Sequence, residues 1–98
     1  MTAPFQLLGQ WISAAHAANT NRQFETAAGL CKQALKVAPN LPEAWYNLAI
    51  AHRGLGRKSE AMDALKKSGT LTRDSADAQN SIGLEFLELG AYPEAKRY

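Results

Sequence analysis

The sequence is poor in the residues that most often carry chemistry. It has one cysteine, Cys31, and two histidines among 98 residues. A single thiol cannot form an internal disulfide, which is typical of proteins from a reducing compartment. Two histidines 36 residues apart (52 − 16) and one cysteine match no metal-ligand spacing. No nucleophile has a spaced base and acid, and no glycine-rich phosphate loop is present. These residues therefore predict no catalytic site, no metal site and no cofactor.

Blocks of like charge and long apolar runs are also absent. Eleven Lys and Arg against nine Asp and Glu give a net charge of +2, scattered along the chain, whereas nucleic-acid binding needs several cations on one face. No apolar run approaches the roughly 20 residues of a membrane-spanning helix. The N-terminal stretch lacks a basic leader, and Gln6 and Gln10 interrupt its apolar part. The sequence predicts a soluble cytoplasmic protein that binds neither nucleic acid nor membrane.

The sequence does contain a repeat. Trp11 and Trp45 lie 34 residues apart (45 − 11), and many residues after the first tryptophan match those after the second. At this period six columns align, namely Trp11, Trp45 and Gln79; Ala14, Leu48 and Ile82; Ala15, Ala49 and Gly83; Ala18, His52 and Phe86; Arg22, Gly56 and Gly90; and Ala27, Ala61 and Ala95. A period of this size indicates stacked supersecondary units.

Within each unit the spacing is helical. One helix face is formed by Trp45, Leu48, Ala49 and His52, at i, i+3, i+4 and i+7. Gly56 can take the left-handed conformation that ends a helix. A second helix is expected from about Arg57, and its equivalent in the first unit from Gln23 to Pro39. Small residues in shared columns predict close helix crossings, and Cys31 and His52 are expected to pack among the core columns.

These residues resemble the tetratricopeptide repeat family. The resemblance is carried by "GQWISAAHAANTNRQFETAAGLCKQALKVAPN", "EAWYNLAIAHRGLGRKSEAMDAL" and "ADAQNSIGLEFLELGAYPEAKRY". It implies an all-α fold, a right-handed superhelix of antiparallel helix pairs. One domain over residues 1–98 would hold repeats at about 8–41, 42–75 and 76–98, the last incomplete. Gln79 in place of tryptophan and Arg22 in place of glycine depart from the family pattern.

By the same resemblance, the first helix of each repeat lines a concave groove that binds a peptide or protein segment. The residues expected there are Ile12, His16, Glu43, Tyr46, Asn47, Ile50, Arg53, Asn80 and Leu84. We prefer four of them as contacts: Tyr46 as an aromatic anchor, Asn47 as an amide for a peptide backbone, Ile50 as an apolar floor and Arg53 as a charge. The predicted function is a non-enzymatic interaction scaffold.

Two narrower functions of the family can be compared with this sequence. The clamp that holds acidic chaperone tails needs Lys, Asn, Asn, Lys and Arg, but those columns read Ile12, His16, Asn47, Asp77 and Ser81, so that partner is excluded. Enzymes similar to O-linked N-acetylglucosamine transferases carry an asparagine ladder, and the columns Ser13, Asn47 and Ser81 match it in part. A recruitment or regulatory region at the N-terminus of such a larger enzyme therefore stays open as the alternative.

The third unit is the expected weak point. Its first helix carries Ile82, Phe86 and Leu89, which a complete second helix would have to cover, yet the sequence ends at Tyr98. Solenoids normally end in a polar cap. We therefore expect self-association there, by a second copy or an exchange of the last helices, or cover by a further repeat in a longer protein.

Overall fold

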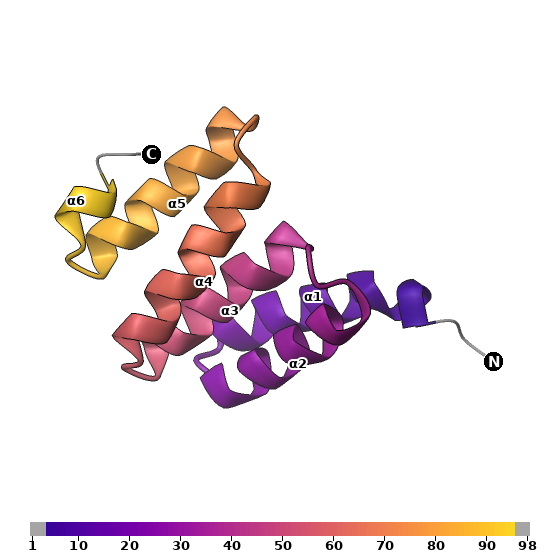
Figure 1. Cartoon of the computed structure of the whole chain (residues 1–98). Coiled ribbons are helices and arrows are strands. Elements are labelled where there is room, and N and C mark those ends of the chain that lie inside the picture. Colours follow the sequence, from indigo (N-terminus) through magenta and orange to yellow (C-terminus); the bar gives the residue numbers. More distant parts are fainter. Residues whose placement is uncertain (1–3, 96–98) are drawn as a thin grey trace.

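The described residues, 4–95 of the computed structural model, form three antiparallel helix pairs. The pairs are α1 (Pro4–Thr20) with α2 (Phe24–Val37), α3 (Pro42–Gly54) with α4 (Lys58–Leu71), and α5 (Ala76–Glu88) with α6 (Tyr92–Ala95). They stand in a row, with α1 and α2 at one end and α5 and α6 at the other (Figure 1). The chain measures 46 × 29 × 18 Å, and its smallest dimension, 18 Å, matches the thickness of two packed helices of ~10 Å diameter each. The predicted all-α superhelix of helix pairs is confirmed, while the expected end of the third unit at 96–98 lies outside the described residues.

Turns of one geometry join the two helices of each pair. The residues with positive φ are Arg22 at 61°, Gly56 at 75° and Gly90 at 74°. In each turn the next N–H donates to the carbonyl five residues earlier: Gln23 to Ala18 at 2.7 Å, Arg57 to His52 at 2.8 Å and Ala91 to Phe86 at 2.8 Å. This pair of features defines a Schellman helix end. The column of Arg22, Gly56 and Gly90 thus provides the left-handed residue. The column of Ala18, His52 and Phe86 provides the carbonyl oxygen that accepts the hydrogen bond from the turn.

The core is built mainly from alanine. Eleven of the sixteen buried apolar side chains among the described residues are alanines, and Ala27 and Ala61, which share a column, are both 0% exposed. Because a methyl group adds little thickness, such helices can pack at the short end of the usual 8–10 Å range of axis separations, about 8 Å. Alanine in these columns therefore sets how closely the helices pack.

Two clusters of buried residues divide the core along the row. The first lies between α1, α2 and α3 around Ala15, Cys31 and Leu48, and the second lies between α3, α4 and α5 around Leu65 and Ile82. Trp45 packs against both clusters, and its Nε1 donates to the carbonyl oxygen of Pro39 at 2.8 Å. The central pair is therefore continuous with both neighbours, as expected for stacked repeats.

Cys31 and His52 are packing residues, as their columns predicted. Cys31 is 0% exposed, and burial raises the pKa of its thiol to about 12. His52 is 5% exposed, and its Nδ1 lies 3.6 Å from Glu60 Oε2. Burial lowers the pKa of the imidazole, while Glu60 opposes that shift.

None of the helices within residues 4–95 is long and apolar enough to cross a membrane.

Arg22 occupies a turn position that glycine occupies in the other two units, so Arg22→Gly is expected to stabilise the chain. An L-residue in the left-handed region destabilises the folded chain by about 1 kcal/mol or slightly more. Glycine regains only part of this free energy, because glycine loses more conformational entropy on folding. Urea unfolding of the variant measures the difference in free energy.

The reciprocal change, Gly56→Arg, is the matched control. No atom lies within 4 Å of a Cβ added at Gly56, so only the backbone conformation penalises the substitution. We expect Gly56→Arg to destabilise the chain by an amount similar to the gain from Arg22→Gly. If both variants unfold at the same urea concentration as the parent chain, strain at these turns does not affect stability.

Candidate functional site

The first two helix pairs fit closely along their first helices. α1 contacts α3 directly, and Ala51 of α3 is 0% exposed within the first cluster. Asn19 of α1 donates from Nδ2 to the backbone carbonyl of Asn47 at 3.0 Å. A small residue at the contact and a hydrogen bond across it hold α1 and α3 side by side.

The second and third pairs fit less closely, and Glu85 stands in the column of Ala51, 34 residues later (85 − 51). Among the described residues, α5 packs mainly against α4 and α6, and its contact with α3 is slight. The carboxylate of Glu85 lies 3.1 Å from Arg53 Nε, and Glu88 lies 3.8 Å from Arg53 Nη1. A longer, charged side chain with its partner thus replaces the alanine contact, and α5 stands apart from α3.

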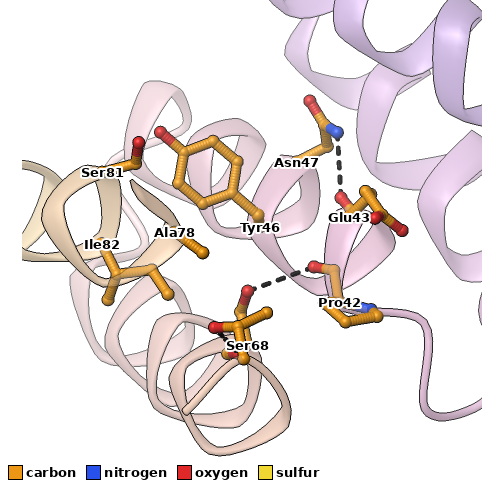
Figure 2. Close-up of a pocket in the computed structure, with 9 residues that line it drawn as sticks. Pro42, Glu43, Tyr46, Asn47, Ser68, Ala78, Ser81 and Ile82 are labelled. Atoms are coloured by element: carbon orange, nitrogen blue, oxygen red, sulfur yellow. Dashed lines mark hydrogen bonds between the residues drawn. The ribbon is translucent and has the colours of Figure 1, made fainter. Parts of the chain in front are cut away.

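A pocket of about 220 Å³ occupies the space between α3, α4 and α5. It is lined by Pro42, Glu43, Tyr46, Asn47, Ser68, Thr72, Ala78, Ser81 and Ile82. Figure 2 shows the ring of Tyr46 directed from α3 toward Ser81, with Ala78 and Ile82 on one side of the gap and Pro42 on the other. Ser68, from the second helix of the central pair, lies at the far end. First helices therefore form the sides of the pocket, and a second helix forms part of its floor.

Three polar side chains of this lining donate hydrogen bonds within the chain. Ser68 Oγ donates to the carbonyl oxygen of Pro42 at 3.1 Å, and Thr72 Oγ1 donates to that of Ser68 at 2.8 Å. Asn47 Nδ2 donates to the carbonyl oxygen of Glu43 at 2.9 Å. Since these donors are engaged, the floor of the pocket offers mainly carbon surface.

The structure distributes the nine predicted groove residues over three hollows and the surface beside them. Glu43, Tyr46 and Asn47 line the pocket described above; Ile50 and Arg53 line a second hollow with Asn19; Asn80 and Leu84 line a third with Ala95. Ile12, which is half-buried, and His16, which is exposed, line none of these hollows. Residues 4–95 contain no group of three or more His, Cys, Asp or Glu side chains arranged to hold a metal ion.

Asn47, which the sequence analysis proposed as an amide contact for a peptide backbone, is largely buried in the structure. Its side chain is only 6% exposed, and its Oδ1 is buried without a hydrogen-bond partner among the described residues. Asn19 of α1 donates to the backbone carbonyl of Asn47, so α1 lies beside this residue. In the free chain the Asn47 amide is part of the packing between two helix pairs.

The sequence analysis missed the pocket floor. Ser68 stands in the column of Ala34, which is 0% exposed, and a hydroxyl in a buried alanine column was a signal of altered packing. The substitution of Ala51 by Glu85 in the third unit was a second signal. Both residues lie where the third pair stacks less closely on the second than the second does on the first.

Comparison with known proteins agrees with this geometry. The sequence profile of the tetratricopeptide repeat matches residues 18–83. The chain belongs to the tetratricopeptide repeat family. A comparison with curated proteins gives no significant match.

Solved structures show the same tetratricopeptide repeat fold. A crystal structure of MamA superimposes with a TM-score of 0.73 at 21% identity, covering 93% of this chain and 53% of that chain. MamA 41-end from Desulfovibrio magneticus RS-1 gives 0.71 at 17% identity, with 85% and 47% covered. A MamA RS-1 double mutant gives 0.76 at 16% identity, with 92% and 51% covered. The chain therefore spans about half the length of these similar structures, and identities this low show a shared fold alone.

The carboxyl group of Glu85 is the most perturbed acid of this tetratricopeptide surface. Burial raises its pKa above the ordinary 4.5, Arg53 lowers it and Glu88 raises it further. The pKa of Tyr46 is likewise raised, first by burial and then by the charge of Glu85, while Arg53 opposes that shift. Burial of the carboxylate thus outweighs its pairing with Arg53.

This balance predicts a pH dependence of stability with a definite sign. Because the pKa of Glu85 is higher in the folded chain, its contribution to stability is fully present below about pH 4.5 and is lost as pH rises through the raised pKa. Relative to Glu85→Gln, the parent chain should therefore lose stability between about pH 4.5 and 7. Urea unfolding of both proteins across this range measures the difference.

Glu88→Gln provides the control, since the Glu88 side chain is 65% exposed and pairs with the same Arg53. Relative to Glu88→Gln, the parent chain is expected to show no such loss of stability over the same pH range. If instead the parent chain gains stability over Glu85→Gln as pH rises, the ion pair outweighs burial and the assignment of the cause is wrong.

Proposed function

We propose that this chain is a non-enzymatic interaction module that binds a peptide or protein segment on the surface formed by α1, α3 and α5, termed here the first-helix face. Membership of the tetratricopeptide repeat family supports a role in protein–protein interaction. Of the preferred contacts, Tyr46 and Ile50 are half-buried, so each still presents part of its apolar side chain. The proposed partner is a protein or peptide, and neither a nucleic acid nor a membrane.

One observation carries this proposal. The exposed large apolar side chains of the described residues are Leu84, at 62%, and Leu87, at 48%, and both belong to α5 on this face. Leu84 shares its column with Ile50. Contiguous apolar surface that stays exposed in a folded domain usually marks a site of interaction. Hollows beside Tyr46, Ile50 and Leu84 add the concave shape that a bound segment needs.

The alternative, a recruitment region of a larger enzyme similar to O-linked N-acetylglucosamine transferases, depended on a ladder through Ser13, Asn47 and Ser81. It gains no support from Asn47, since that amide is buried. The interaction module is therefore the preferred proposal.

Self-association through the third pair is proposed as well. The hollow lined by Asn80, Gly83, Leu84, Leu87 and Ala95 lies between α5 and α6 and includes both exposed leucines. A second copy of the chain that covers this hollow would remove them from water, which is favourable. Sedimentation at increasing concentration should show a dimer that Leu87→Ser weakens; a chain that stays monomeric throughout contradicts this proposal.

Binding of the partner segment is expected to depend on apolar contacts more than on charge. Once a partner is captured from a lysate of the source organism, its affinity should fall by less than about tenfold between low and physiological salt, whereas a polyelectrolyte interface loses about 10³-fold or more. Tyr46→Ala combined with Ile50→Ser should abolish capture. Isothermal titration with the identified segment gives both affinities.

Lys66→Ala combined with Lys67→Ala serves as the control, because both lysines are exposed on α4, outside the first-helix face. Capture that survives the first-helix variant but fails with the α4 variant would place the partner on the opposite side. A steep loss of affinity with salt would also contradict the proposal.

A further inference from the structure

The pocket between α3, α4 and α5 has the size of one side chain. Its volume is about 220 Å³, whereas pockets for drug-sized ligands run from about 300 to 1,000 Å³ and a cavity of ~150 Å³ already holds benzene. Resting on the proposed function, we propose that this pocket receives one large aliphatic or aromatic side chain of the bound segment, flanked there by Lys or Arg.

The lining of the pocket selects an apolar side chain. Tyr46 and Ile82 form two of its walls and Ala78 a third, while the hydroxyl groups of Ser68 and Thr72 donate to carbonyl oxygens of the chain itself. A polar side chain that packs against Ala78 and Ile82 would lose its water without gaining a partner on that side of the pocket, which is costly. An apolar side chain has no hydrogen bonds to water to lose, and its insertion removes apolar surface from water, which is favourable.

The charges around the mouth of the pocket select the flanking residues. Glu43 lines the pocket and is exposed, and Asp77, which directly precedes Ala78, is exposed in the first turn of α5. Lys67, beside Ser68, and Arg73, beside Thr72, are exposed cations adjacent in sequence to the lining, whereas Glu43 is, among the described residues, the one charged side chain of the lining itself. Complementary charge on a partner guides its approach and fixes its register. Lys or Arg next to the inserted residue meets that requirement, and Glu or Asp opposes it.

The pocket is specific to the second and third pairs. Between α1 and α3, Ala51 and the bond from Asn19 to Asn47 bring the helices together. Between α3 and α5 the helices lie further apart, Glu85 pairs with Arg53 across the gap, and the pocket occupies the space beside them. The hollow beside Asn19, Ile50 and Arg53 is a separate feature with a different lining. Insertion of a side chain into the pocket between α3 and α5 would set the register of a segment lying along the first-helix face.

A peptide library displayed on phage tests this inference on the whole chain. Random peptides are selected on the parent protein, and the enriched peptides are measured by fluorescence anisotropy. We expect them to share one Leu, Ile, Met or Phe with Lys or Arg nearby. Replacing that residue by Ala should weaken binding by at least about tenfold, as for a buried anchor residue.

Two variants of the protein block the pocket, and a third provides the control. Ala78→Phe fills the pocket from its wall, and Ser81→Phe fills it from an exposed position that tolerates substitution if Ala78→Phe fails to fold. Ala76→Phe adds the same ring at an exposed position of the same helix, outside the lining. Both blocking variants should weaken peptide binding by at least about tenfold, and Ala76→Phe should leave it unchanged.

The outcomes separate this inference from the proposed function. Peptides that bind the parent chain and the folded blocking variants equally would overturn the pocket inference alone. Enriched peptides without a shared apolar residue, or with acidic flanks, would overturn it as well. A dimer that the blocking variants abolish would assign the pocket to a second copy of this chain. A library that yields no peptide for the parent protein would contradict the proposed function itself.

Discussion

Close packing of helices through alanine is the constraint on which the rest of the structure depends. Where the alanine column falls at a crossing in the first two pairs, at Ala27 and Ala61, the residue is fully buried and the helices of the pair lie close together. The 34-residue period places the same turn after each first helix, so every pair leaves its turn with equivalent geometry. Stacking then results from the clusters that Trp45 joins, since each pair covers the apolar side of its neighbour.

The candidate functional site lies where, among the described residues, the third pair packs less closely on the second than the second does on the first. Glu85 replaces the alanine found at Ala51, and its carboxylate requires the guanidinium of Arg53. The buried charge costs more than the pair returns, as the raised pKa of Glu85 indicates. The pocket lies between the same two helix pairs, and a departure from the regular repeat pattern is generally expected at a functional site.

Local chemistry explains which features the sequence could predict. The helix pairs result from period and glycine placement, and the burial of Cys31 and His52 results from their columns. The burial of Asn47 depends on how near α1 comes, and no pattern within α3 contains that distance. The contribution of Ser68 to the pocket likewise depends on how far α5 stands from α3. Contacts within a unit were thus predictable, while differences between successive interfaces required the structure.

The central claim is that the residue in the column of Ala51 and Glu85 sets the separation of successive first helices. A crystal structure of the Glu85→Ala variant, solved beside that of the parent chain, tests it most directly. The account predicts that α5 moves into side-by-side contact with α3, as α3 contacts α1, and that the pocket of about 220 Å³ closes. An α5 that keeps its distance from α3, with the pocket unchanged, would contradict the account.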